Sequence, residues 1–554
     1  MSKFTSYNIN EKYSTSVAYF SMEFAIHQSL KVYGGGLGFL AGSHMRSAYD
    51  LGQNMIGIGI LWSYGYYDQT RDKDRNIKVD FVRKKYYFLK DLNLSVDVTV
   101  NAHTVKVKAY LVESEIFNTA PVILLTTDIE ENDYLSRTIT HQLYDTNQET
   151  RIAQEIVLGN GGVKVLEALH LNPEIYHLNE GHALPAVFEL YKKYKTLEEL
   201  RQKVVFTTHT PEAAGNEEHG LELLHKMGFF AELPIEETYQ FMERKDGIFN
   251  LTVGALKASK ITNGVSKLHA KVANKMWSHV QNRCEIIHIT NAQNRRYWAD
   301  KGLLKALDEY EDYELESRKK HLKKILFDEV ADQTGKMFDP NVLTIVWARR
   351  FTEYKRPGLL KYDFEKFLKL VNSHEMPVQL IWAGKPYPFD YGAIDTFNEI
   401  NHMSDNFKNI AVLMGYELDL SMMLKKGADV WLNTPRITNE ASGTSGMSAG
   451  MNGAINLSTY DGWHPEFEKH GINCFTIKPT DHTLAFEVQD SIDNKNLMDI
   501  LFNEVVPLYY KDRKKWITIM KNSMDDTMFA FDSGRMAHEY YVYMYDKNNH
   551  KELR

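Results

Sequence analysis

Four cations lie within eight residues of the chain, directly after an apolar run that is typical of a β-strand. The segment is Arg349-Arg350-Phe351-Thr352-Glu353-Tyr354-Lys355-Arg356. Each charge-assisted hydrogen bond to a phosphate oxygen contributes roughly 1.5 to 3 kcal/mol, so Arg350 and Lys355 together could hold a phosphate. The alternative is a surface ion-pair cluster with Glu353. The segment predicts a phosphate clamp at the end of a strand.

Two glycine-rich turns each precede a predicted helix. They are Tyr33-Gly34-Gly35-Gly36-Leu37-Gly38 and Gly443-Thr444-Ser445-Gly446. Backbone N–H groups at a helix start can approach an anion, and the helix dipole adds attraction. The alternatives are a tight turn for the first and an N-cap from Thr444 or Ser445 for the second. Two such cradles beside one cation clamp predict a diphosphate or two neighbouring phosphates, and Glu440 could accept hydrogen bonds from the hydroxyls of an attached sugar.

Polar residues also follow the carboxyl ends of two other predicted strands. Glu180 and His182 follow one of them, and His209 follows the other. Either histidine could simply cap the end of its strand. No Cys/His spacing typical of a metal site accompanies them, so we expect no metal. A nucleophile elbow of the type Gly-x-Ser-x-Gly is also missing, and the sequence gives hydrolase chemistry no support.

Short β-branched and apolar runs alternate with helical patterns, which is the signature of an α/β fold with parallel sheets. One series precedes the charged segment 311–332 and another follows it, so we expect two Rossmann-like domains. Within that segment Leu322, Ile325 and Leu326 predict one apolar helix face. Ligands of parallel sheets bind beyond the carboxyl ends of the strands, and a cleft between the domains is the expected active site. The predicted strands are 17–20, 122–125, 175–178, 204–206, 286–289, 343–347, 378–382, 410–413 and 430–432.

The overall charge limits the classes of partner. The 554 residues carry a net charge of -8, so no global positive field attracts nucleic acid or an acidic membrane surface. Two cysteines, Cys284 and Cys474, are too few for a disulfide framework. The N-terminal residues lack a targeting pattern, and the most apolar stretch, Met55–Trp62, is too short to cross a bilayer. We expect a cytoplasmic protein.

Taken together, these segments resemble the short form of the α-glucan phosphorylases over nearly the whole chain. The resemblance implies a GT-B fold. An N-terminal Rossmann-like domain over 1–305 would carry the glycine loop and the acceptor side, and a C-terminal one over 306–525 would carry the donor site. A helix within 526–554 would return to the first domain, and a homodimer is possible in this family. The matching stretches are 17–24, 33–38, 154–159, 176–182, 263–269, 348–356 and 429–447.

The resemblance also implies roles for individual residues. Phosphate binding would fall to Arg350 and Lys355 with the loop glycines, and the cofactor phosphate would lie in the cradle of Thr444 and Ser445. The acceptor side would include Glu180 and His182, and Tyr416 would lie beside the cofactor ring. Contacts to a glucose-like sugar are implied for His209, Asn291, Glu440, Ser442 and Gly443. The loop glycines are Gly35, Gly36 and Gly38.

The departures from the family pattern cluster around the cofactor and the acceptor. Ser448 stands where the family has the lysine that holds pyridoxal phosphate as an imine, and a serine cannot form that imine. Ala292 replaces a glycine, and Asn216 replaces a histidine. We therefore expect no covalent cofactor, with pyridoxal phosphate lost along with its tether.

The leading hypothesis is a retaining α-glucosyltransferase that uses a nucleotide-diphosphate glucose and transfers glucose to a glucan or another hydroxyl acceptor. Arg350, Lys355, His209 and Glu440 would carry the reaction, with the cations stabilising the leaving phosphate. Retaining enzymes of this fold usually place a second glutamate for the ribose at the position of Ser448, which departs from that pattern too. Two alternatives stay open: a phosphorylase that forms glucose 1-phosphate with non-covalent pyridoxal phosphate, and a catalytically silent glucan-binding partner.

Overall fold

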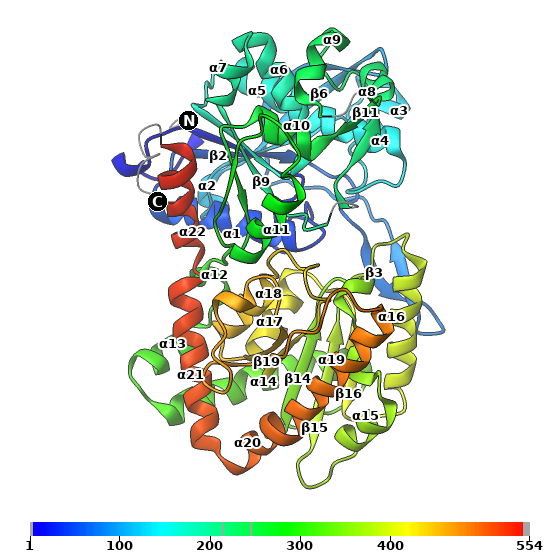
Figure 1. The fold of residues 1–554 in the computed structure, drawn as a ribbon, viewed down its shortest axis with the longest axis vertical. Coiled ribbons are helices and arrows are strands. Elements are labelled where there is room, and N and C mark those ends of the chain that lie inside the picture. The colour runs from blue at the N-terminus through cyan, green and yellow to red at the C-terminus, as the bar shows by residue number, and fades with distance from the viewer. Residues whose placement is uncertain (1–3, 213–214, 244–245, 547–554) are drawn as a thin grey trace. The chain divides into compact units, whose positions relative to one another are not determined.

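The computed structural model describes residues 4–212, 215–243 and 246–546. The chain forms two units, and neither is a continuous stretch of sequence. Unit 1 consists of residues 1–67, 81–294 and 533–554, and unit 2 consists of residues 68–80 and 295–532. Figure 1 colours the chain from its N-terminus to its C-terminus.

Unit 1 is built on a sheet of nine strands in the order β13-β12-β9-β8-β1-β2-β7-β6-β5. Pairing is parallel from β13 to β7 and antiparallel from β7 to β5. The strands are β1 (Val17–Phe20), β2 (Met55–Ile60), β5 (Lys90–Val100), β6 (His103–Val112), β7 (Val122–Thr126), β8 (Ile175–Asn179), β9 (Val204–Thr208), β12 (Ile261–Gly264) and β13 (Glu285–His288), with a separate hairpin of β10 (Glu218–Gly220) and β11 (Ile248–Asn250).

Helices connect the parallel strands of unit 1. Within one long helical stretch, α4 (Gln148–Ile156) passes through a π-helical turn, η3 (Val157–Gly161), into α5 (Gly162–Ala168). Near the end of the chain, α22 (Ser533–Tyr540) packs against α1 (Gly36–Leu51), as Figure 1 shows. The other helices of unit 1 include α2 (Ser114–Phe117), α3 (Tyr134–Thr138), α6 (Pro185–Tyr194), α7 (Leu197–Arg201), α8 (Leu221–Met227), α9 (Ile235–Thr238), α10 (Leu251–Ala258), α11 (Lys267–Met276) and the π-helical η11 (Tyr541–Tyr545).

Unit 2 is built on a fully parallel sheet of six strands in the order β16-β15-β14-β17-β18-β19. Side chains alternate between its two faces: Leu343 and Trp347 of β14 belong to one apolar core, and Val346 belongs to the other. Burial on both faces explains why these strands read as continuous apolar runs. The strands are β14 (Leu343–Ala348), β15 (Val378–Ala383), β16 (Ile410–Leu413), β17 (Val430–Asn433), β18 (Ile455–Thr459) and β19 (Cys474–Ile477).

The early hairpin of β3 (Asp68–Arg71) and β4 (Ile77–Asp80) belongs to unit 2. Gln69 donates through Nε2 to the carbonyl of Gly384 at 2.9 Å and accepts from the N–H of Gly415 at 2.9 Å. The helices of unit 2 are α12 (Arg295–Trp298), α13 (Lys301–Asp308), α14 (Asp312–Thr334), α15 (Phe364–Val371), α16 (Tyr391–Ser404), α17 (Leu418–Gly427), α18 (Ser445–Gly450), α19 (Phe486–Ile500), α20 (Val506–Lys511) and α21 (Arg513–Ala530).

The expected α/β class with parallel sheets is confirmed, and each predicted run lies in a strand except that 286–289 extends one residue beyond β13. One detail was wrong. Leu322 and Leu326 of α14 are buried as predicted, but Ile325 is 40% exposed, because it lies off the face that these two leucines share with Leu315 and Val330. None of the helices within the described ranges combines the length and the apolar character needed to cross a membrane.

Candidate active site

The cations of the 349–356 segment follow β14, the strand at the centre of the unit 2 sheet. Arg349 comes directly after this strand, and its N–H donates to the carbonyl of Ala383 in the neighbouring strand at 3.1 Å. The chain then makes a 3-10 turn, η7 (Glu353–Lys355), which buries Lys355. The strand end and the turn together hold Arg349 and Lys355 in fixed positions.

Glu440 is the carboxylate that both cations contact. Its Oε2 accepts from Arg349 Nη2 at 2.8 Å and from Lys355 Nζ at 2.5 Å. The side chains of Arg349, Lys355 and Glu440 are 5%, 10% and 11% exposed. Burial alone would raise the pKa of Glu440, but Lys355 and Arg349 outweigh it and hold the pKa below its usual value. Glu440 is therefore an anion in the folded protein.

This cluster carries more positive than negative charge, since two buried cations face one carboxylate. Among the described residues, Arg349 Nη1 and Ser442 Oγ are buried and have no hydrogen-bond partner. Gly443 adopts φ +83°, and a Cβ on it would come within 3.1 Å of Glu440 Cγ and 3.3 Å of Arg349 Nη2. Only glycine fits at position 443, and unpartnered polar atoms of Arg349 and Ser442 lie in the same cluster as Glu440.

Arg350, which the sequence predicts as a phosphate ligand, is exposed. It helps to lower the pKa of Glu440, although less than Lys355 and Arg349 do. Lys355 and Glu440, both predicted, are brought together, whereas the contribution of Arg349 was missed. The presence of four cations in eight residues was the only signal, and it did not indicate which of them face inward.

Asp461 supports the backbone of Glu440 and was also missed. Its Oδ2 accepts from the N–H of Glu440 at 2.9 Å, and its Oδ1 accepts from the N–H of Gly462 at 2.9 Å. Burial raises the pKa of Asp461 to about 7, although these backbone donors act in the opposite direction. Asp461 therefore holds Glu440 in place and is titrated near neutral pH.

We expect Asp461→Asn to flatten the pH dependence of stability. The folded protein retains the Asp461 proton up to about pH 7, whereas the unfolded chain releases it above a pKa of 3.8. The wild-type free energy of unfolding therefore loses a contribution as the pH rises from about 4 to 7. Urea unfolding at several pH values measures this slope. The control is Asp499→Asn at an exposed position, and equal slopes for wild type and Asp461→Asn would contradict the assignment.

The short helix α18 carries Ser448, which is fully buried. Its Oγ donates to the carbonyl of Ser445 at 3.2 Å, and the carbonyl of Thr444 lies 3.5 Å away. Ser445 Oγ accepts from Trp431 Nε1 at 3.3 Å, and the Thr444 hydroxyl makes no capping bond to the helix. The hydroxyl of Ser448 is thus bound to its own helix, and the side chain offers no amine.

Tyr416 lies near the end of β14. Its hydroxyl donates to the carbonyl of Ala348 at 3.2 Å, and Ser421 Oγ lies 3.4 Å from it. Burial raises the pKa of Tyr416, and the charge of Arg349 is close enough to lower it in part. This places Tyr416 beside the Arg349 end of the cluster.

In unit 1, the glycine loop is held by a carboxylate that the sequence analysis did not single out. Glu23 Oε2 accepts from the N–H groups of Gly34 at 2.6 Å and Gly35 at 2.9 Å, and Tyr144 donates to Glu23 Oε1 at 2.5 Å. A Cβ on Gly38 would lie 2.6 Å from Tyr33 Cβ and 2.9 Å from Glu23 Oε2. Close packing explains the glycine at 38, and Gly36 begins α1.

The ends of β8 and β9 bring Glu180 and His209 together. Glu180 Oε2 accepts from the N–H of His209 at 2.7 Å, and His209 Nε2 lies 2.8 Å from Asn179 Oδ1. An amide oxygen only accepts, so Nε2 carries the proton and Nδ1 is left as an acceptor. Burial lowers the pKa of His209 to about 3 and raises that of Glu180 to about 7. Glu180 also has φ +73°, an unusual value that is often found at functional sites.

Two further predicted residues of unit 1 have unused polar atoms. Within the described ranges, Asn291 Oδ1 and His182 Nδ1 are buried without a hydrogen-bond partner. Burial lowers the pKa of His182 to about 3, so its imidazole is neutral. By contrast, Asn216 is fully engaged: its Nδ2 donates to the carbonyl of Glu212 at 2.7 Å, and its Oδ1 accepts from Thr252 Oγ1 at 2.6 Å. Asn216 is thus part of the packing.

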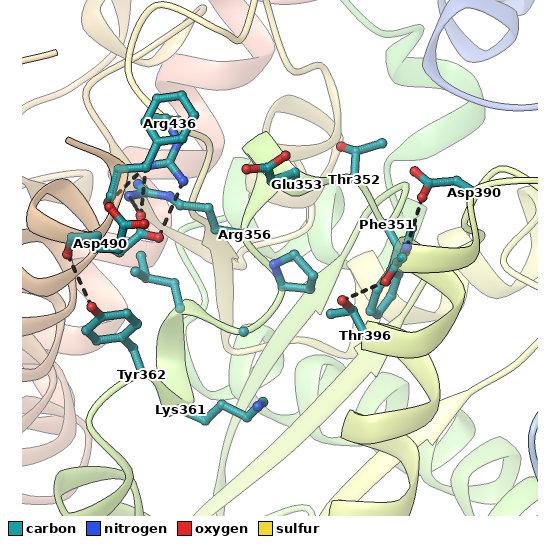
Figure 2. Close-up of a pocket in the computed structure, with 17 residues that line it drawn as sticks. Phe351, Thr352, Glu353, Arg356, Lys361, Tyr362, Asp390, Thr396, Arg436 and Asp490 are labelled. Atoms are coloured by element: carbon teal, nitrogen blue, oxygen red, sulfur yellow. Dashed lines mark hydrogen bonds and ion pairs between the residues drawn. The ribbon is translucent and has the colours of Figure 1, made fainter. Parts of the chain in front are cut away.

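A pocket of about 750 Å³ also lies in unit 2 and is lined in part by Phe351, Thr352, Glu353 and Arg356 of the cation segment. Figure 2 shows Arg356 and Arg436 both reaching Asp490, with contacts of 3.0 Å and 2.9 Å. These two cations are already paired. Lys355 and Glu440 do not line this pocket, which is separate from the predicted phosphate site.

Comparison with known proteins identifies the family of this chain. The carbohydrate phosphorylase family, as a sequence profile, matches residues 251–472. The chain belongs to this family. It is 35% identical to the maltodextrin phosphorylase of Thermococcus litoralis, over 97% of this chain and 71% of the relative, and 31% identical to the glycogen phosphorylase of Aquifex aeolicus, over 97% and 87%. An uncharacterized protein of Methanocaldococcus jannaschii is 49% identical, over 95% of this chain and 99% of that protein.

Proposed function

We propose that this protein is a retaining α-glucosyltransferase that takes glucose from a nucleotide-diphosphate glucose and needs no covalently bound pyridoxal phosphate. The observation that carries the proposal is the buried cluster of Arg349, Lys355 and Glu440. Its surplus positive charge suits a diphosphate, and its carboxylate suits sugar hydroxyls. Membership of the phosphorylase family supports glycosyl transfer as the reaction class.

In the proposed reaction, the bond between the glucose C1 atom and the diphosphate oxygen breaks, and its electron pair stays on the phosphate. The acceptor hydroxyl oxygen bonds to C1 on the same face, and its proton passes to the departing phosphate. Lys355 and Arg350 stabilise the charge that develops on the leaving group. Glu440, Ser442 and the backbone at Gly443 orient the sugar, and no protein nucleophile is required.

In unit 1, His209 and Asn291 are proposed to bind the sugar's 6-hydroxyl. The neutral imidazole of His209 accepts at Nδ1, because Nε2 donates to Asn179. The buried Oδ1 of Asn291 is a second acceptor. Glu180 and His182 are proposed for the acceptor side, where a carboxyl with a pKa of about 7 can accept or donate a proton.

Ser448 does not fit a covalently bound pyridoxal phosphate, because its side chain has no amine. Ser448, which stands where the resemblance implies the family lysine, is a buried hydroxyl that is bound to its own helix. The proposed mechanism therefore contains no step through that cofactor. A second candidate function, a phosphorylase with untethered pyridoxal phosphate, is favoured by one observation: Thr444 and Ser445 are partly exposed at the start of α18, where the family cradles the cofactor phosphate.

The test is a thermal-shift screen with UDP-, ADP- and GDP-glucose. A ligand at 100 times its Kd stabilises the folded state by about 2.7 kcal/mol, so at least one of these donors is expected to raise the Tm and to support glucosyl transfer to a glucan. If none of the three donors raises the Tm, the proposal is wrong. Phosphate-dependent release of glucose 1-phosphate that requires added pyridoxal phosphate would favour the second candidate, and glucan binding without turnover under every donor would favour a silent binding partner.

A further inference from the structure

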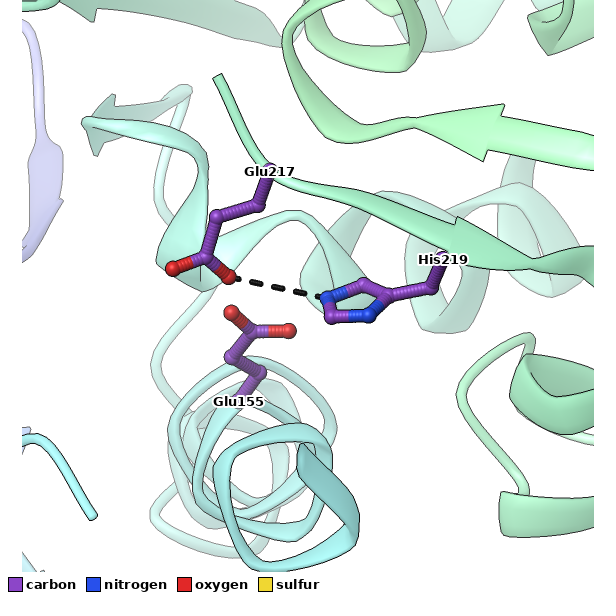
Figure 3. A group of neighbouring side chains, drawn as sticks. All are labelled: Glu155, Glu217 and His219. Carbon is purple, nitrogen blue, oxygen red and sulfur yellow. Dashed lines mark ion pairs between the residues drawn. The ribbon is translucent and has the colours of Figure 1, made fainter. Parts of the chain in front are cut away.

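A group of three potential metal ligands lies in unit 1, apart from the residues discussed above. Glu155 on α4, Glu217, and His219 on β10 each offer one ligand atom, and these atoms all lie within 4.8 Å of one another. Figure 3 shows the Glu155 carboxylate rising from its helix toward the other two side chains. A helix and a hairpin that are distant in sequence thus bring two carboxylates and an imidazole together.

Glu155 is buried, and the nearby charge of Arg151 offsets the effect of burial on its pKa only in part. It is 1% exposed, and neither of its carboxylate oxygens has a hydrogen-bond partner in the described part of the chain. A buried ionised carboxylate without a partner is strongly unfavourable. Burial accordingly raises the pKa of Glu155 to about 8. A cation at this point would remove the penalty directly.

The potential ligand atoms of Glu217 and His219 lie close to the same point. Glu217 Oε2 and His219 Nε2 are both buried without a hydrogen-bond partner among the described residues, and they lie 3.6 Å apart. Two ligand atoms of a tetrahedral Zn²⁺ ion are separated by about 3.4 Å, given bonds of about 2.0 to 2.1 Å. This pair therefore already has the spacing of metal ligands, and Glu155 can close the remaining distance by side-chain rotation.

Neighbouring side chains hold the ligands in place. Arg151 forms an ion pair with the other oxygen of Glu217, which leaves Oε2 directed at His219. Gln148 lies 2.8 Å from His219 Nδ1 through its amide. The atom that faces Nδ1 is the amide nitrogen Nε2 of Gln148. Metal binding at His219 Nε2 requires this amide to turn, so that its oxygen accepts from Nδ1 and the Nε2 lone pair is presented. Outer contacts of this kind orient the ligands of protein metal sites.

We propose that Glu155, Glu217 and His219 bind a divalent transition-metal cation of the Zn²⁺ type, with a solvent molecule in the fourth position. Mixed carboxylate and imidazole ligands suit such ions better than they suit Mg²⁺ or Ca²⁺, which prefer oxygen ligands alone. The ion would join α4 to β10. The π-helical turn η3 begins two residues after Glu155, and such turns are frequent at functional sites.

The test is metal binding by the full-length protein. The protein is treated with EDTA and then dialysed against ZnCl₂ at pH 8. Elemental mass spectrometry is expected to give one Zn²⁺ per chain, and the Tm is expected to rise with Zn²⁺ concentration. Glu155→Gln and His219→Gln are expected to weaken the affinity by more than about 100-fold, beyond the loss caused by removing an outer contact. His225→Ala, at an exposed histidine of the same unit, is the control and retains the metal.

A second measurement guards against variants that fail to fold. Without metal, Glu155→Gln is expected to be at least as stable as EDTA-treated wild type, because the amide removes a buried charge. Co²⁺ bound to the wild type is expected to give visible absorption bands that Zn²⁺ abolishes. A wild type that binds no stoichiometric metal, or Glu155→Gln and His219→Gln variants that bind it as tightly as His225→Ala, would overturn the proposal.

Discussion

Glu440→Ala is expected to lower the free energy of unfolding by about 3 to 5 kcal/mol, the usual cost of removing one partner from a buried ion pair. The reason is that Arg349 and Lys355, only 5% and 10% exposed, would be left facing each other without a carboxylate. Urea unfolding followed by tryptophan fluorescence measures this loss. Six of the eight tryptophans lie in unit 2, so the signal reports mainly on the unit that contains Glu440.

The pH dependence of this effect has a definite sign. The folded-state pKa of Glu440 lies below its usual value of 4.5, so its contribution to stability is complete above about pH 4.5 and is lost as the pH falls further. The difference between wild type and Glu440→Gln is therefore expected to shrink in acid. Glu375→Ala, at an exposed glutamate of unit 2, serves as the control and is expected to change stability by less than about 0.5 kcal/mol. A Glu440→Ala variant as stable as this control would show that the cluster is not formed.

Lys355→Met is expected to reduce the turnover number for glucosyl transfer by about 100- to 1,000-fold, the range observed when one preorganised donor to a developing negative charge is removed. Lys355 Nζ contacts Glu440 and lies in the same cluster as Arg349, so its charge is available where the leaving phosphate is proposed to bind. Steady-state kinetics with the donor identified by thermal shift provide the measurement. Arg350→Met is expected to cost about 10- to 150-fold, equivalent to one charge-assisted hydrogen bond of roughly 1.5 to 3 kcal/mol.

Lys369→Met is the matched control for the lysine substitution, because Lys369 is an exposed lysine on α15 of the same unit. It is expected to retain wild-type turnover and donor binding. Circular dichroism checks that Lys355→Met is folded. If the folded Lys355→Met variant keeps turnover within a few-fold of the Lys369→Met variant, the proposed role of the cation cluster is wrong.

The sequence was sufficient to predict the fold class and part of the strands, because the signals for both are local, whereas strands such as β2, β12, β18 and β19 were not predicted. β14 and β17 are buried on both faces and therefore read as uninterrupted apolar runs. The exposure of Ile325 was not predictable from spacing alone, since a helix face of three residues is compatible with slightly different orientations. The membership of 68–80 in unit 2 was also not predictable, because the hydrogen bonds of Gln69 are to residues more than 300 positions away.

The sequence predicted several residues of the candidate site, but it did not predict which of them contact one another. Glu440 and Lys355 could be named because each lies in a motif, and the family resemblance added roles for His209 and Asn291. Arg349 was passed over because adjacent residues after a strand alternate in direction, and the sequence does not show which of Arg349 and Arg350 faces inward. Asp461 and Glu23 act through backbone N–H groups, which leave no pattern in the sequence.

The metal-ligand cluster illustrates another limit. The sequence shows no Cys/His spacing typical of a metal site near His182 and His209, and no metal was expected there. The proposed ligands Glu155 and His219 are separated by more than 60 residues and belong to different elements. Only the packing of α4 against the segment that leads into β10 brings them together, so no local spacing could have indicated them.

The route of the chain constrains the order in which the protein can fold during synthesis. The last helical residues of unit 1, including the fully buried Tyr540 and Tyr545, leave the ribosome only after the whole of unit 2 has been made. Tyr545 lies 2.6 Å from Nδ1 of the buried His177 in the central strand β8. A nascent chain that stops before residue 533 therefore exposes the interior of unit 1, and the N-terminal half must wait for the C-terminus before its core can close.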